Sequence, residues 1–199
     1  GDLTRQPTRD AAAFDLYLRG RHVWLKATPL GASSAMINGD SILYYASRVL
    51  ERDSSFAGGH FLLSAYYTVA ALRGWRSPLG AMLDSGVVEA RRAIALDSSF
   101  ADPLVILGVV HFYSTDDWVQ VRQTLAKAVQ LNPHLPQARH YYGLYLAEAE
   151  RQLDSGVAHV RRAVELEPHP VFLNTLGDIY LRARRYDSAI FATSLLRMV

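Results

Sequence analysis

LDSGVVEARRAIALD, at Leu83–Asp97, returns almost unchanged as LDSGVAHVRRAVELE at Leu153–Glu167. The two stretches align without gaps at an offset of 70 residues, and 9 of their 15 positions are identical. An offset of 70 residues is twice 35, which is about the length of one helix-turn-helix repeat. A second phrase, DSSFA, begins at Asp53 and again at Asp97, each time directly after an apolar pattern typical of a helix. We interpret these phrases as turns between repeating units.

Placing unit boundaries at these turns predicts that the rest of the chain consists of helix pairs. Asp154, Asp187 and either Asp84 or Asp117 are expected to cap helices. The first helices are expected near residues 10–26, 57–73, 101–113, 136–150 and 170–183, and the second helices near 40–52, 79–97, 117–131, 154–167 and 187–199. We therefore expect one all-α domain over residues 1–199, with units at approximately 10–56, 57–100, 101–135, 136–169 and 170–199.

The units resemble the tetratricopeptide repeat, or TPR. The characteristic spacing is carried in the last unit by Leu173, Leu176, Gly177, Tyr180, Tyr186 and Ala189, and in two earlier units by Leu107-Gly108 with Ala128 and Pro133 and by Tyr142-Gly143 with Ala163 and Pro168. The resemblance implies a right-handed superhelical α-solenoid of about five helix-turn-helix units. In such arrays the small residues allow close helix crossings, and each unit must stack on its neighbours to bury its apolar face.

Four phrases in chain order resemble, more narrowly, the TPR region of bacterial signalling proteins: AFDLYLRGRHVW, GWRSPLGAM, HFYSTDDW and ARHYYGLYLAEAERQLDSGV. In that group the array follows a serine/threonine kinase, a winged-helix regulator or a cyclase-like domain. The resemblance implies an interaction or sensor module without chemistry of its own, in the cytoplasm. Because the chain begins at Gly1 and ends within an apolar pattern, we expect it to be a fragment of a longer protein.

Composition disfavours several classes of function. The net charge is only +2 and the basic residues are scattered, which argues against a nucleic-acid partner. The absence of cysteine excludes disulfides and thiol nucleophiles, and the histidines form no metal-ligand motif. The longest apolar stretch, Phe61–Leu72, is too short to span a bilayer. We therefore expect no enzyme activity, cofactor, metal site or membrane insertion.

The exposed face of each first helix lines the concave groove in the TPR family, and the resemblance assigns partner binding to it. Its first half is apolar and its second half polar, which favours a peptide or helix of another protein; an apolar small ligand sensed by an attached effector is the alternative. A covering turn near Trp75 and Pro78 would instead make the apolar half part of the core. The groove residues are Tyr17, Arg21, Trp24, Phe61, Val105, Val109, Phe112, His140, Asn174, Asp178 and Arg182.

The last predicted helix carries apolar residues that no following helix covers. A solenoid usually ends in a polar-faced cap. We therefore expect either a longer chain or dimerisation through this helix, with the contact made by Ile190, Phe191, Leu195, Leu196 and Met198.

Overall fold

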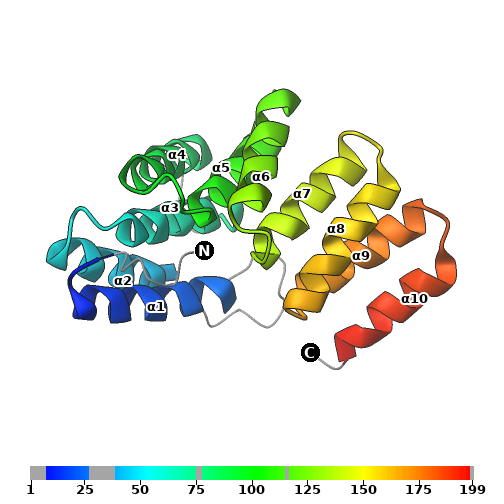
Figure 1. Cartoon of the computed structure of the whole chain (residues 1–199), viewed down its shortest axis with the longest axis horizontal. Coiled ribbons are helices and arrows are strands. Elements are labelled where there is room, and N and C mark those ends of the chain that lie inside the picture. Colours follow the sequence, from blue (N-terminus) through cyan, green and yellow to red (C-terminus); the bar gives the residue numbers. More distant parts are fainter. Residues whose placement is uncertain (1–7, 27–38, 75–77, 115–116, 198–199) are drawn as a thin grey trace. The chain divides into compact units, whose positions relative to one another are not determined.

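The computed structural model describes residues 8–26, 39–74, 78–114 and 117–197, and in these ranges it contains ten α-helices, one short 3-10 helix and no strand (Figure 1). The chain divides into two compact units, Gly1–Val110 and His111–Val199, which we call unit 1 and unit 2. The boundary falls inside the fifth helix, α5 (Asp102–Ser114). The turn around Trp75 lies outside the described residues, as does Met198.

Unit 1 contains two complete helix pairs and the first part of α5. The pairs are α1 (Ala11–Lys26) with α2 (Gly39–Arg52), and α3 (Ala57–Leu72) with α4 (Leu79–Leu96). Contacts join α1 with α2, α2 with α3 and α3 with α4, and the first helices α1 and α3 also contact each other. This alternation places first helices in one layer and second helices in another, as expected for a solenoid. Phe61 and Leu62 of α3 and Ile42 of α2 are completely buried at its centre.

Unit 2 repeats this arrangement. After the end of α5 it contains α6 (Trp118–Leu131), α7 (Pro136–Glu148), α8 (Leu153–Leu166), α9 (Pro170–Arg182), α10 (Tyr186–Ser194) and the 3-10 helix Leu195–Arg197. Neighbouring helices pack from α6 to α10, and the first helices α7 and α9 contact each other. Val160, Leu125 and Leu173 are among its fully buried side chains.

Glycine sets the closest helix crossing in unit 2. A Cβ added to Gly143 on α7 would lie 2.7 Å from Val160 Cγ2 and 2.9 Å from the Gly156 carbonyl oxygen on α8. A Cβ added to Gly156 would lie 2.8 Å from Ala147 Cβ. Side chains at either position would therefore force these two helices apart, which explains the glycine of the TPR-like pattern.

The two DSSF turns of unit 1 share two hydrogen bonds from serine to aspartate, and Asp53 also accepts one from Thr8 Oγ1 at 2.6 Å. Asp53 Oδ1 accepts from the backbone N and the Oγ of Ser55 at 2.9 and 2.7 Å. Asp97 Oδ1 accepts from the same atoms of Ser99 at 3.0 and 2.7 Å. Such aspartate turns hold the backbone between helices. Each turn ends in a phenylalanine, Phe56 or Phe100, that precedes the next first helix.

The all-α solenoid fold predicted from the sequence is confirmed, and the ten helices begin and end within two residues of the predicted positions, except that the last ends at Ser194. The capping prediction holds for Asp117, whose side chain accepts from Gln120 N at 3.0 Å. It is wrong for Asp154 and Asp187, which lie within the first turns of α8 and α10. The single-domain organisation stays a prediction.

Candidate functional site

The apolar half of the predicted groove is packed as core in unit 1. Tyr17, Trp24 and Phe61 are only 8%, 7% and 0% exposed. The Trp24 and Phe61 rings meet edge to face at 5.0 Å, and Phe100 packs edge to face on Phe61 at 5.4 Å. The expected open surface of these residues is therefore corrected: aromatic neighbours from other helices and turns enclose them.

Val105 and Val109 on α5 are also buried, so they offer no open surface. Beside them, Arg21 on α1 forms an ion pair with Asp102 at the start of α5, with Nε and Nη2 at 3.2 and 3.0 Å from Oδ1. Burial raises the pKa of Asp102, and the Arg21 guanidinium acts in the opposite direction. Arg21, predicted as a groove residue, therefore lies in a partly buried ion pair that links two helices.

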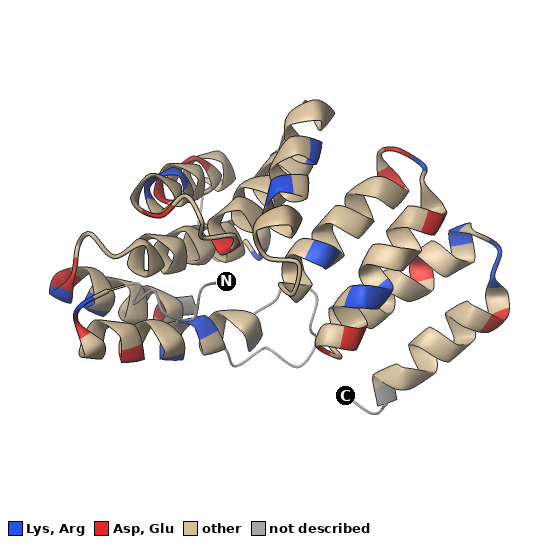
Figure 2. Cartoon of the chain, viewed as in Figure 1, with Lys and Arg blue, Asp and Glu red and all other residues tan. Residues whose placement is uncertain are grey.

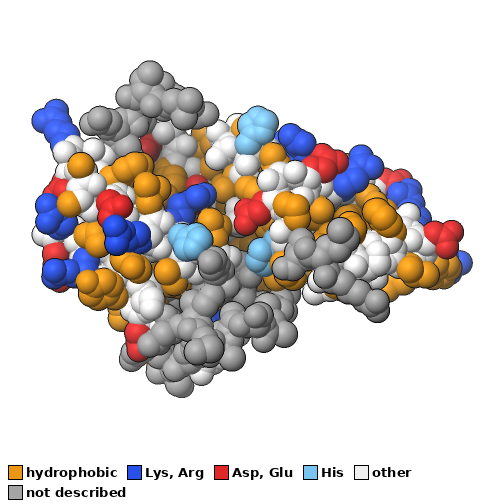
Figure 3. Space-filling model, turned by 90° about the horizontal axis from the view of Figure 1, so that it is seen from below, with side chains coloured by type: hydrophobic (Ala, Val, Ile, Leu, Met, Phe, Trp, Pro, Cys, Tyr) orange, Lys and Arg blue, Asp and Glu red, His pale blue; other side chains and the backbone are white. Residues whose placement is uncertain are grey.

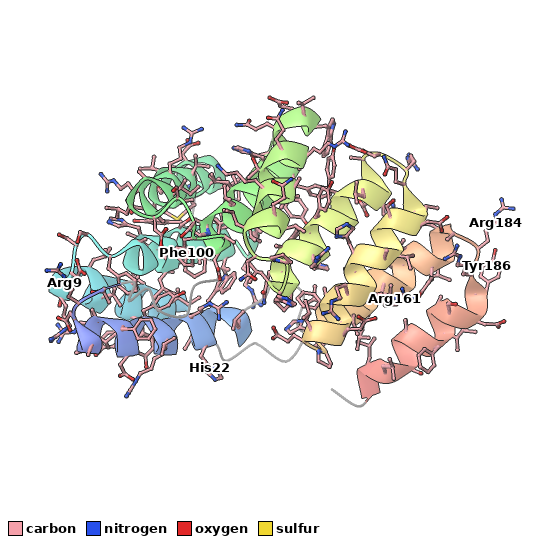
Figure 4. The ribbon with its side chains drawn as sticks, viewed as in Figure 1. Arg9, His22, Phe100, Arg161, Arg184 and Tyr186 are labelled. Carbon is pink, nitrogen blue, oxygen red and sulfur yellow. The ribbon has the colours of Figure 1, made fainter. Side chains whose placement is uncertain are left out.

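A pocket opens beside Tyr17, with a volume of about 240 Å³. Tyr17 and Phe56 form its buried wall, whereas Phe14 and Phe100 are half-buried. Figure 4 marks Phe100 in the turn between α4 and α5. The lining residues are Phe14, Tyr17, Phe56, Ala57, Gly58, Asp97 and Phe100. Its wall is mainly aromatic and contains one acidic side chain.

His140 is the central side chain on the first-helix face of unit 2. It is 2% exposed, and its Nε2 lies 2.9 Å from Thr175 Oγ1 on α9. The Phe172 and Tyr141 rings both lie 4.7 Å from the imidazole. Burial, followed by the nearby His169, lowers the pKa of His140 to about 3. His140 is therefore neutral at physiological pH, and its predicted position on an exposed groove is corrected to an interior one.

Two buried polar atoms on α7 have no hydrogen-bond partner among the described residues, namely Gln137 Oε1 and His140 Nδ1. Residues three positions apart on a helix are neighbours on one face, with Cβ atoms about 5–6 Å apart. The first-helix face of α7 therefore holds an unused acceptor beside an unused ring nitrogen.

The adjacent face of α9 is open. Asn174, Asp178 and Arg182 are exposed there, as the sequence predicted. Arg182 Nη2 donates to Glu148 Oε1 on α7 at 2.9 Å, and both side chains are well exposed. Within the described part of the chain, Asn174 and Asp178 make no side-chain hydrogen bond. Helix α9 is in contact with α7, and Thr175, which follows Asn174 in the chain, is the hydrogen-bond partner of His140.

Phe112 lies in a different cluster of unit 2, away from the polar face. Its ring packs on Tyr113 at 5.1 Å and on Trp118 at 5.7 Å. Tyr113 and Trp118 are 53% and 41% exposed. The structure therefore assigns Phe112, a predicted groove residue, to an aromatic cluster at the α5–α6 turn.

The end of unit 2 does expose apolar side chains. Ile190 and Phe191 are 67% and 66% exposed on α10, and Leu195 and Leu196 are half-buried. Arg184 lies in the turn that precedes this helix, and Tyr186 is the first residue of the helix (Figure 4). Dimerisation through this helix stays a prediction.

Charged residues are interspersed along the helices in both units (Figure 2). In the space-filling view, hydrophobic side chains reach the surface between charged ones (Figure 3). Among the described residues, no three histidine, aspartate or glutamate side chains are grouped to hold a metal ion. No helix in the same ranges is long and apolar enough to cross a membrane.

Two features of these sites were not predicted from the sequence. Thr175, the hydrogen-bond partner of His140, lies 35 residues after it. This separation is one repeat length, so the sequence could have indicated that the two residues are neighbours. The phenylalanines of the two DSSF turns were visible as a repeated phrase, but their contribution to one pocket depends on the packing of α1 against α3.

No protein-family model and no curated protein matches this chain. Several solved structures do. The TPR protein TTC0263 of Thermus thermophilus superposes with a TM-score of 0.65 at 16% identity, over 90% of this chain and 87% of that one. PilF of Pseudomonas aeruginosa gives 0.64 at 19% identity, over 96% and 77%. YrrB, a TPR protein with an unusual peptide-binding site, gives 0.51 at 19% identity, over 90% of each chain.

Proposed function

Because this chain has the all-helical fold of the TPR solenoids, we propose that it is a protein-interaction module that binds an extended peptide along α7 and α9 of unit 2. The observation that carries the proposal is the pair of buried, unpartnered atoms Gln137 Oε1 and His140 Nδ1. We propose no catalytic role for it.

The unpaired atoms match the groups of a peptide backbone. A buried polar atom without a partner costs about 1–3 kcal/mol, so a ligand that pairs with it gains that energy. In the proposed complex the Thr175 hydroxyl donates to His140 Nε2, which leaves the hydrogen on Nδ1 as a donor. Gln137 Oε1 is an acceptor and turns outward on binding. Both atoms are buried in the free chain, so the proposal requires both side chains to move on binding, after which a backbone carbonyl and a backbone N–H of the peptide pair with this donor and this acceptor.

Asn174 and Asp178 on α9 extend the same polar surface. They are four residues apart, so they lie on one face of the helix, and both are exposed. The Asn174 amide can donate and accept, whereas the Asp178 carboxylate only accepts. A peptide that lies across the two helices therefore meets both hydrogen-bond donors and hydrogen-bond acceptors. The negative charge of Asp178 favours a basic residue in the peptide.

The test is selection of peptides from a random displayed library, followed by calorimetric titration of the best binder. We expect Asn174→Ala and Asp178→Ala each to weaken binding by about tenfold, the loss of one well-formed polar contact. Arg161→Ala on the second helix α8, where Figure 4 marks the exposed side chain, is the matched control and keeps full affinity. Equal binding by all three variants, or a selection without a specific binder, contradicts the proposal.

Gln137→Leu separates binding from folding. It replaces a buried, unpartnered amide by an apolar side chain of similar size, so we expect the free energy of unfolding to rise by about 1 kcal/mol. The same change removes the acceptor for the peptide and is expected to weaken binding. A variant that binds normally shows that Gln137 is not part of the site.

A regulatory role within a larger bacterial signalling protein, in the cytoplasm, belongs to the same proposal and is supported by the sequence phrases quoted above. The domain encoded next to this segment in the complete gene tests it. A neighbouring kinase, winged-helix or cyclase-like domain is the expected result, and an unrelated context would contradict the signalling role.

A further inference from the structure

The repeated DSSF turns of unit 1 build one pocket together. The first turn supplies Phe56, and the second supplies Asp97 and Phe100. Phe14 and Tyr17 on α1 and Ala57 and Gly58 on α3 complete the described wall. The turns have matching hydrogen bonds, but only the second places its aspartate in the lining. This difference sets the charge of the pocket.

The aromatic rings of the lining stand at steep angles to one another. Phe56 meets Tyr17 at 5.3 Å between ring centroids with an interplanar angle of 70°, and Phe100 meets Tyr17 at 6.4 Å and 77°. Phe14 lies nearly parallel to Tyr17 at 6.1 Å. The three phenylalanine rings therefore pack around Tyr17 at different angles and do not form one flat stack. The negative faces of aromatic rings attract cations, and pockets lined by several aromatic rings suit methylated ammonium groups.

Among the described residues of the lining, Asp97 supplies the only carboxylate. The first turn of α3, at Ala57 and Gly58, also lines the pocket, and its partial positive charge opposes a cation. A helix end carries about half an elementary charge, whereas a carboxylate carries a full one. Arg21, which acts on Tyr17, is offset by its ion-pair partner Asp102. Among the described residues that line the pocket, the carboxylate charge therefore outweighs that of the helix end, which favours a positive ligand.

We propose that this pocket binds a methylated ammonium group, held by the rings of Phe14, Tyr17, Phe56 and Phe100 and by the charge of Asp97. The volume is sufficient: the pocket measures about 240 Å³, and a cavity of about 150 Å³ admits benzene. The methyl groups of a trimethylammonium ion gain free energy when they leave water for an apolar wall, and the attraction between the cation and the rings offsets the cost of removing the charge from solvent. The group belongs either to a free small molecule or to a methylated lysine side chain.

The experiment is a titration of the full chain followed by NMR, with choline as the cationic probe and 3,3-dimethylbutan-1-ol as its neutral isostere. We expect choline to bind saturably and at least about fivefold more tightly than the isostere, from the cation–ring attraction and Asp97. Acetylated and amidated trimethyl-lysine is titrated in parallel. Tighter binding of this probe than of choline identifies a protein side chain as the source, and the reverse identifies a free small molecule.

Asp97→Asn keeps the side-chain oxygen that accepts from Ser99 and removes the charge, so we expect choline affinity to fall at least about fivefold with the fold intact. Asp53→Asn is the matched control, since Asp53 makes the same turn but does not line the pocket. Equal affinity for choline and the isostere, equal losses in both variants, or no saturable binding of either cation overturns the proposal. This site and its probes are separate from the peptide face of unit 2, so either proposal can fail without the other.

Discussion

Units 1 and 2 have nearly the same sequence on their second helices α4 and α8, yet the first helices that cross them differ. Opposite Gly86 of α4 stands Ser64, whose hydroxyl donates to the Gly86 carbonyl at 2.7 Å. Opposite Gly156 of α8 stands Gly143, which has no side chain to donate. Ser64 and Gly143 both lie seven residues after the first residue of their helix. The α3–α4 crossing is therefore stabilised by a side-chain hydrogen bond, and the α7–α8 crossing by close backbone contact.

A second matched pair of positions reverses its electrostatics. In unit 1, His60 Nδ1 lies 2.6 Å from the carboxylate oxygen Oε2 of Glu89. Seventy residues after Glu89, unit 2 has His159, whose Nδ1 lies 3.4 Å from Arg139 Nη1. Burial and the Arg139 charge lower the pKa of His159. The two units therefore share the pairs of helices that touch, whereas the side chains that make each contact differ.

The largest change in the free energy of unfolding is expected on the face of the first helices. Phe61 and Asn174 both lie four residues after the start of their helix, but Phe61 is fully buried and Asn174 is exposed. Phe61→Ala is expected to lower the free energy of unfolding by about 3–5 kcal/mol. Asn174→Ala is expected to change it by less than about 0.5 kcal/mol. Denaturant unfolding measures the free energy of unfolding of both variants. Similar losses would show that the first-helix faces of the two units do not differ in burial.

A substitution at the closest crossing has the next largest effect. Gly143→Leu forces a branched side chain against Val160 and the Gly156 carbonyl, and should cost about 1–3 kcal/mol by overpacking. Gly80→Ala is the control, because a Cβ there meets nothing within 4 Å. Alanine within the helix should raise stability by about 0.5–1 kcal/mol. An unchanged melting curve for Gly143→Leu would show that the α7–α8 crossing is not as close as described.

Acidification should loosen unit 2 before unit 1. The folded pKa of His140 is lowered to about 3, so below pH about 6.5 the unfolded chain binds a proton that the folded chain does not. Stability therefore falls as the pH drops through this window, by about 1–2 kcal/mol between pH 6.5 and 5. The lowered pKa values of His159 and His169 act in the same direction.

Two carboxylates of unit 1, Asp10 and Asp53, do not share this window. Their pKa values are lowered, so the stability that they add is lost only below their ordinary value of 3.8. The raised pKa of Asp102 acts in the opposite direction, because acid removes the cost of its buried charge. Hydrogen exchange of α7 and α9 peptides, corrected for the intrinsic effect of pH, should rise more steeply than that of α1 and α3 peptides. His140→Gln should reduce the difference, and a uniform response of both units would contradict the assignment.

The smallest effect tests whether the two crossings are interchangeable. In Gly143→Ser the hydroxyl can reach the Gly156 carbonyl as Ser64 reaches that of Gly86. We therefore expect this variant to be about 1 kcal/mol more stable than Gly143→Ala, the value of one hydrogen bond. Equal melting temperatures of the serine and alanine variants would show that the α7–α8 geometry does not permit this bond.

The sequence predicts the helices of this protein well and its surfaces poorly. Helix positions follow from local apolar periodicity and from repeated phrases such as LDSG, which need no knowledge of the neighbours. Whether a first-helix residue is exposed depends on side chains from other helices and turns. Phe61 is enclosed because Trp24 and Phe100 pack on it, whereas Asn174 has no such cover. The polar residues of α9 were therefore predicted correctly as surface, and the aromatic residues of α1 and α3 were not.

The Arg21–Asp102 ion pair has a consequence for the lifetime of the folded state. It joins residues 81 positions apart, whereas most helix contacts in unit 1 join neighbours along the chain. Contacts between distant residues form late in folding, because the intervening chain must be ordered first. An interaction absent from the folding transition state slows unfolding and has little effect on refolding. This ion pair is thus expected to determine how long unit 1 stays folded, and hardly how fast it folds.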